Sequence, residues 1–163
     1  MSEFSYSFAL TSRHASEPVV SGEAVPMETL IAAQNAMAAM PGAKTDFSDQ
    51  TAHHFSRGVY GRNFKMPAGQ TVMSKVHKHS CFFVMLKGEL LVAGNQGKRI
   101  VRAGEWFITE AGAKRCVHAL TDVECMTFHG TNETDIDAVE AELIVPETIE
   151  AIQFQPCDLL GVF

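Results

Sequence analysis

Between residues 53 and 129, apolar and polar residues alternate in short runs, a pattern typical of β-strands. Turn residues such as Pro67-Ala68-Gly69 and Gly94-Asn95-Gln96-Gly97 separate the runs at the spacing of an all-β barrel or sandwich. The connections are too short for helical crossovers, so we expect antiparallel pairing. The expected strands are residues 53–55, 59–65, 71–79, 82–86 continuing to 93, 99–103, 106–109, 115–120 and 124–129.

Two segments outside this region carry apolar residues at helical spacing. The first predicts a helix over about residues 27–39, with Pro26 in its first turn and Pro41-Gly42 as its stop. The second predicts a helix after Thr131 that Asn132 or Thr134 caps. The apolar positions are Met27, Leu30, Ile31 and Met37 in the first helix, and Ile136, Val139 and Leu143 in the second.

The chain therefore divides into residues 1–50, an N-terminal arm and helix; 51–130, the barrel; and 131–163, a C-terminal helix and apolar tail. Both ends carry apolar side chains that predict packing on the barrel or on a partner chain. Alternation at one end predicts a short strand that adds to a sheet or crosses to another subunit. We therefore expect a homo-oligomer. These end residues are Phe4, Tyr6 and Phe8, then Ile149, Ile152, Phe154, Leu159, Leu160 and Phe163.

Composition narrows the functional classes. The formal net charge is -6 and no Lys/Arg run stands out, which disfavours binding to nucleic acid. No apolar stretch approaches the roughly 20 residues that a membrane helix needs, and the start lacks the pattern of a signal peptide. The 4 cysteines form no CxxC pair, which favours reduced thiols. We expect a protein of the cytoplasm that is not secreted.

The strongest chemical signal is His77-Lys78-His79, followed by Cys81. Imidazoles at i and i+2 on an extended segment point to the same side, where both can reach one metal ion. Neutral imidazole suits Zn, Fe, Ni, Cu or Mn. A third ligand is needed, for which Cys81 and His129 rank equally and His118 ranks lower. No glycine-rich phosphate loop or zinc-protease motif is present.

The β region resembles the cupin superfamily, a small double-stranded β-helix or jelly-roll barrel that often holds a metal at its mouth. Gly69, His77, His79 and Gly88 match its first motif, and Gly104 and Gly112 match its second. Cys81 stands where the motif has a Glu, Arg115 where it has a His, and Ala119 where it has an Asn. Two of the four metal positions that the resemblance implies are therefore kept.

A narrower resemblance covers most of the chain and concerns uncharacterised cupin-like proteins predicted in tailed bacteriophage genomes. It implies a phage origin, with the protein in the host cytoplasm or incorporated in the virion, where other virion proteins are partners. The residues that carry it are His53-His54-Phe55, Gly58-Val59-Tyr60, Arg62, Pro67-Ala68-Gly69, His77-Lys78-His79, Lys87-Gly88, Ala111-Gly112, Lys114-Arg115, Thr127, His129 and Thr134-Asp135.

Lys114-Arg115 leaves two interpretations open. Arg115 either provides an anion-binding fork for a carboxylate or phosphate, with His118 nearby in sequence, or forms a buried salt bridge. The salt-bridge partner would be Glu89, Glu110 or Glu124.

Two functional hypotheses follow. The first is a metal- or small-ligand-binding cupin that acts as a binding protein or as a virion or tail accessory. The second is a metalloenzyme, an oxygenase, isomerase or hydrolase, in which His77, His79 and either Cys81 or His129 hold the metal. The catalytic residues of such an enzyme are not identified by the sequence.

Overall fold

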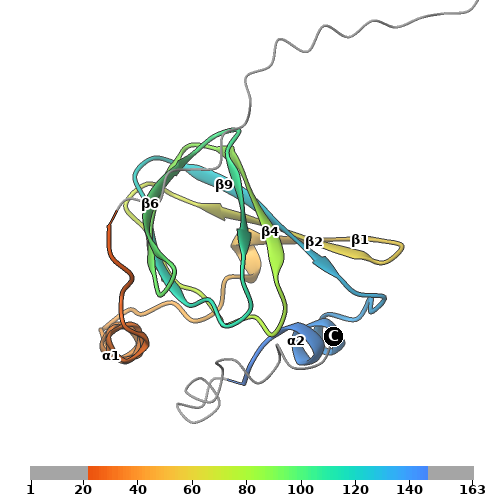
Figure 1. Cartoon of the computed structure of the whole chain (residues 1–163), viewed down its shortest axis with the longest axis horizontal. Helices are drawn as coiled ribbons and strands as arrows, with labels where there is room; N and C mark the ends of the chain where they lie inside the picture. Colours follow the sequence, from red (N-terminus) through yellow and green to blue (C-terminus); the bar gives the residue numbers. More distant parts are fainter. Residues whose placement is uncertain (1–21, 147–163) are drawn as a thin grey trace, which may run out of the picture.

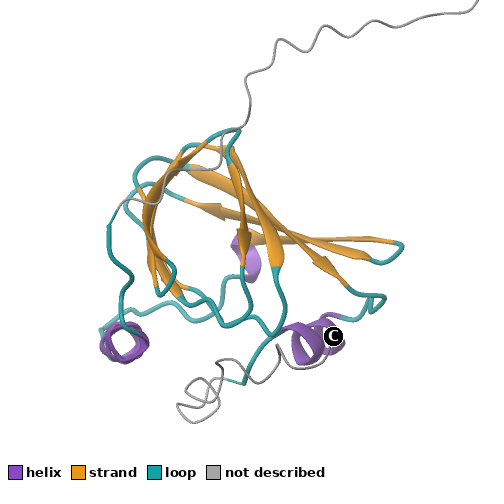
Figure 2. Ribbon diagram, viewed as in Figure 1, coloured by secondary structure: helices purple, strands orange, loops and turns teal. Residues whose placement is uncertain are grey.

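The computed structural model describes residues 22–146, in which two antiparallel sheets curve around one core to form a jelly-roll barrel (Figures 1 and 2). The first sheet has the strand order β1-β2-β9-β4-β7 and the second has the order β3-β8-β5-β6. Every strand pair is antiparallel, as the short connections predicted. The strands are β1 (Thr51–Ser56), β2 (Val59–Met66), β3 (Thr71–Met73), β4 (Cys81–Lys87), β5 (Glu89–Gly94), β6 (Gly97–Arg102), β7 (Trp106–Thr109), β8 (Arg115–Ala119) and β9 (Val123–Gly130).

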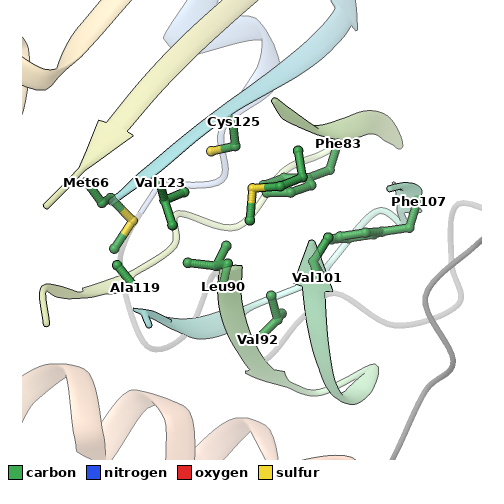
Figure 3. Close-up of a cluster of buried hydrophobic side chains, with 10 residues drawn as sticks. Met66, Phe83, Leu90, Val92, Val101, Phe107, Ala119, Val123 and Cys125 are labelled. Atoms are coloured by element: carbon green, nitrogen blue, oxygen red, sulfur yellow. The ribbon is translucent and has the colours of Figure 1, made fainter. Parts of the chain in front are cut away.

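The core fills one end of the barrel, between the inner faces of the two sheets. Figure 3 shows these side chains pointing toward one another from strands of both sheets. Alternation explains the set, because every second residue of each strand points inward. Burying a side chain of this size contributes roughly 1.5–3 kcal/mol before chain entropy is counted. The core residues are Met66, Phe83, Met85, Leu90, Val92, Val101, Phe107, Ala119, Val123 and Cys125.

The predicted continuous run over 82–93 is wrong, because the chain changes sheets within it. β4 lies in the first sheet and β5 in the second, and Gly88 between them has a φ of 85°. A Cβ at Gly88 would lie 2.2 Å from the backbone oxygen of Asp122. Glycine is required there by both the conformation and the space. Apolar residues continue across this corner, so the pattern alone did not reveal it.

The predicted strand over 71–79 ends at Met73, and the histidine segment that follows is a connection between elements. Its backbone groups bond to several neighbours rather than to one strand. Ser74 N–H donates to the Arg115 carbonyl, and Gly112 N–H donates to the His77 carbonyl. His77 also forms an isolated β-bridge with Ile144. His77 and His79 therefore do not share the regular strand on which the prediction of a common side rested.

Two helices and a short 3₁₀ helix flank the barrel: α1 (Met27–Ala38), α2 (Ile136–Leu143) and η1 (Ser48–Gln50). In Figure 1 both α-helices lie outside the sheets, at the lower part of the view. Asp135 caps α2 by accepting from Ala138 N–H at 3.0 Å, in place of the predicted Asn132 or Thr134. None of the helices in residues 22–146 has the length and apolar character needed to cross a membrane. The predictions for the apolar end residues fall in 1–21 and 147–163, outside the described residues.

Candidate functional site

Three of the four predicted metal-binding residues come together inside the barrel. His129, near the end of β9, has its ring centroid 5.0 Å from that of His77. The Cys81 Sγ atom, at the start of β4, lies 3.9 Å from Nδ1 of His77. His129 also hydrogen-bonds through Nε2 to the Thr127 hydroxyl at 3.0 Å. The predicted strand over 71–79 does not extend to His77. The fold nevertheless brings His77, Cys81 and His129 together.

Burial sets the protonation of this group. Burial, assisted by His129 and by the charge of Arg115, lowers the pKa of His77 to about 3. It lowers the pKa of His129 to about 4, assisted by the positive charge of Arg62. Burial also raises the pKa of the Cys81 thiol. At neutral pH both imidazoles are therefore neutral and the thiol keeps its proton.

Two other predicted site residues lie away from this group. His79 is exposed. His118 is half-buried and its Nδ1 lies 2.8 Å from the Thr71 hydroxyl, across the β3–β8 pair. Arg115 and His118 differ by three positions along β8, so they point to opposite faces of the sheet. The structure thus places neither His79 nor His118 beside Arg115.

Arg115 is buried at the start of β8, with 8% of its surface exposed. Its Nη2 donates to the hydroxyl of Thr109. Burial, together with the charge of Arg99, lowers the pKa of the guanidinium to about 10. Burial removes most of the water from around this charge, and the neutral Thr109 hydroxyl replaces only part of that solvation.

The predicted salt bridge of Arg115 is wrong for the described residues. Glu89 pairs with Arg102 at 3.1 Å, and Glu124 lies 3.9 Å from the Lys65 ammonium. Glu110 is exposed and forms no ion pair within residues 22–146. Across that same range, no carboxylate lies within ion-pair distance of the Arg115 guanidinium.

Arg115 and Arg99 line one small pocket beside the β5–β6 turn. Both guanidinium carbons lie over the ring of Phe107, at 5.2 Å for Arg115 and 4.6 Å for Arg99. Lys114 also lines the pocket, and its buried ammonium donates to the Gln34 side-chain oxygen and to the Ser74 carbonyl. Asp and Glu are absent from the lining, which is Val92, Gly94, Asn95, Gln96, Gly97, Arg99, Phe107, Ala113, Lys114 and Arg115.

Arg99 is a site residue that the sequence analysis missed. It lies two residues before the core residue Val101 on β6, so it shares the inward face. Strand parity in residues 97–102 was the signal that could have found it. An arginine at an inward position of a barrel strand is unusual enough to indicate a ligand or a buried partner.

The three side chains that come together do not form a complete group of metal ligands in this arrangement. Within residues 22–146, no three or more His, Cys, Asp and Glu side chains form a group that could hold one. The positive charges of Arg62 and Arg115 disfavour a proton on His77, and they oppose a metal cation in the same way. The prediction of Zn, Fe, Ni or Mn at His77, His79, His129 and Cys81 stays a prediction.

Comparison with known families matches residues 62–129 to the model described as "Cupin domain". The match supports the cupin superfamily that the sequence resemblance indicated. No curated protein matches the chain.

Several solved structures align with the chain at low identity. A cupin-2 domain containing protein from Shewanella frigidimarina is 14% identical, with a TM-score of 0.43 over 65% of this chain and 100% of its own. KdgF from Halomonas sp. is 14% identical, with a TM-score of 0.46 over 57% of this chain and 88% of its own. Salicylate 1,2-dioxygenase from Pseudoaminobacter salicylatoxidans is 12% identical, with a TM-score of 0.49 over 71% of this chain and 33% of its own. Identities this low do not allow the activity of any of these proteins to be assigned to the chain.

Proposed function

We propose that the cupin domain binds a small anionic molecule, a carboxylate or phosphate compound, in the pocket at Arg115. The observation that carries this proposal is a buried guanidinium with no carboxylate partner among residues 22–146. A buried charge without a counter-charge costs several kcal/mol, and a bound anion removes that cost. Arg99 adds a second positive charge to the same pocket.

The donor chemistry of the pocket suits this ligand class. A guanidinium presents paired N–H groups that match the two oxygens of a carboxylate or phosphate. Phe107 stacks on Phe83 with ring centroids 4.8 Å apart, which supplies an apolar wall. A small organic acid therefore finds both a charged and an apolar partner.

The test is thermal unfolding of the full chain with added anions. Inorganic phosphate, acetate and benzoate are compared at constant ionic strength against chloride. A ligand present at about 100 times its Kd stabilises the folded state by about 2.7 kcal/mol and raises the Tm. Arg115→Gln should abolish the rise and Arg99→Gln should reduce it. Arg102→Gln, at an exposed arginine paired with Glu89, is the matched control and should keep it.

Two outcomes would contradict the proposal. One is the absence of a Tm rise with any anion. The other is a rise that persists in Arg115→Gln, which would place the anion elsewhere. Native mass spectrometry of the purified protein adds a direct reading, because a tightly held anion travels with the chain.

A metal centre at His77, Cys81 and His129 is the second candidate, and the enzymatic hypothesis depends on it. The proximity of the three side chains and the neutral imidazoles favour it. Elemental analysis of the purified protein tests it. Near-stoichiometric Zn, Fe, Ni or Mn that is lost in His77→Ala supports a metal-binding protein. If the protein holds only trace metal after loading with each of these ions, it is not a metal-binding protein.

The phage origin and a place in the virion are supported by the sequence resemblance alone. They are compatible with an anion-binding accessory protein. Peptides of this chain in purified particles of a phage that encodes it would support the virion location, and their absence would contradict it.

A further inference from the structure

The inner face of the barrel carries a third arginine besides the two that line the pocket. Arg62 lies on β2 opposite Thr127 of β9, and two residues further along the strand Phe64 lies opposite Cys125. Phe64 packs on the core and Cys125 belongs to it, so this face of both strands points inward. Residues two apart on a strand share a face, and Arg62 therefore points into the barrel as well.

The described strands direct three arginines into the barrel and no carboxylate. Their two acidic residues, Glu89 and Glu124, are each adjacent in sequence to inward-facing core residues and so point outward. None of the three arginines forms an ion pair within residues 22–146. The charge of this interior is therefore more than a single carboxylate neutralises.

One row of cross-strand neighbours connects Arg62 with the pocket. Arg62 lies opposite Thr127, and Thr127 lies opposite Phe83. Phe83 in turn lies opposite Phe107, the ring over which both pocket arginines lie. The row crosses three strand spacings, about 14 Å between the backbone positions at its ends. Side chains on the inner, concave face of a curved sheet converge, so the gap between the guanidinium groups is shorter and suits a small organic molecule.

The charges of Arg62 and Arg115 act on the same part of this inner face. Burial raises the pKa of the Cys125 thiol to about 12, and the two guanidinium charges both oppose that rise. Arg62, Arg99 and Thr127 are only half-buried although they point inward, so water reaches this side of the interior. A dissolved ligand can follow the same route.

We propose that the ligand of this pocket is a dicarboxylic acid with an apolar spacer. This inference rests on the anion binding proposed above and specifies the class of anion. One carboxylate pairs with Arg115 and Arg99, and the other pairs with Arg62. Phe83 and Phe107, stacked with their ring centroids 4.8 Å apart, supply an apolar surface for the spacer (Figure 3). A monocarboxylate would leave the charge of Arg62 uncompensated.

Isothermal titration calorimetry of the full chain with matched acids tests the proposal. Adipate is compared with hexanoate, and terephthalate with benzoate, at pH 7 and constant ionic strength. The protein is first dialysed against a chelator, so that no acid binds through a metal. At least one diacid should bind about tenfold more tightly than its monoacid, because its second carboxylate gains charge-assisted hydrogen bonds from a guanidinium.

Three variants assign this preference to residues. Arg62→Gln should remove it, so that the diacid binds no more tightly than its monoacid. Arg115→Gln should abolish binding of both acids. Lys65→Gln, at an exposed and outward-facing cation of the same strand, is the matched control and should keep the preference. Circular dichroism establishes that each variant is folded, and Arg62→Met replaces Arg62→Gln if that variant is not.

The outcomes separate this inference from the anion proposal on which it rests. Equal binding of diacids and monoacids by the wild type would overturn the diacid and leave the anion site at Arg115 standing. A preference that survives Arg62→Gln, or one that is lost in Lys65→Gln, would also overturn it, because Arg62 would then not be the second partner. If no acid binds at all, both proposals fail.

Discussion

Lowering the pH from about 7 to about 5 should destabilise this protein through His77 and His129. Both have folded-state pKa values far below 6.5, about 3 and about 4. As the pH falls through 6.5, the unfolded chain takes up protons on these residues and the folded chain does not. The stabilisation from these two groups is therefore fully present above that pH and declines below it.

The magnitude follows from the width of that window. As the pH falls from the unfolded pKa of 6.5 to pH 5, each histidine lowers the free energy of unfolding by about 2 kcal/mol. The pair therefore lowers it by about 4 kcal/mol. This is a large share of the 5–15 kcal/mol that holds a typical domain folded, as an approximate range. His53 adds to the loss in the same direction, because burial lowers its pKa too.

Urea unfolding at the two pH values measures the effect. The protein is first dialysed against a chelator, so that no metal contributes to stability. The double variant His77→Gln and His129→Gln should lose only about 1 kcal/mol or less over the same pH step. His54→Gln, at an exposed histidine of β1, is the control and should show the wild-type loss. If the double variant lost as much stability as the wild type, the two buried histidines would not be the cause.

Three further substitutions test other parts of the structure, each by urea unfolding. Gly88→Ala should cost about 2–4 kcal/mol, because a backbone oxygen lies 2.2 Å from the new Cβ, whereas Gly69→Ala, with a similar φ and open space, should cost about 1 kcal/mol. Arg115→Met should stabilise the anion-free protein by about 1–3 kcal/mol by removing a buried charge, and a loss of stability would contradict that account. Asp135→Ala should cost about 1 kcal/mol through the lost cap of α2, and an unchanged midpoint would show that the cap contributes nothing.

The antiparallel barrel could be predicted because its signals are local. Alternation over residues such as 123–130 appears in the sequence itself, since one face of the strand is buried and the other is not. The corner at Gly88 could not be predicted in the same way. Apolar residues continue on both sides of it, and only the close approach of Asp122 from the opposite turn explains the break.

The candidate site was predictable in part. His77, Cys81 and His129 were named from sequence, and they do lie together. The prediction nevertheless rested on a wrong premise. It assumed that His77 and His79 lie on one strand, and the histidine segment is not a strand. The surroundings of Arg115 depend on which residues approach from other strands. Strand parity could have revealed Arg99, but the lack of a nearby carboxylate among residues 22–146 cannot be read from residues adjacent in sequence.

The charge of Arg115, more than the nearby histidines, decides what this part of the barrel can hold. Two imidazoles and a thiol supply donor atoms, but a divalent cation also needs compensating negative charge or at least an absence of opposing charge. Arg115 stands where the cupin motif has a histidine, and Cys81, with a raised thiol pKa, stands where it has a glutamate. These two exchanges remove one potential anion and add one permanent cation beside the same imidazole pair. We therefore expect that a barrel which suits a cation with the motif residues favours an anion with the residues of this chain.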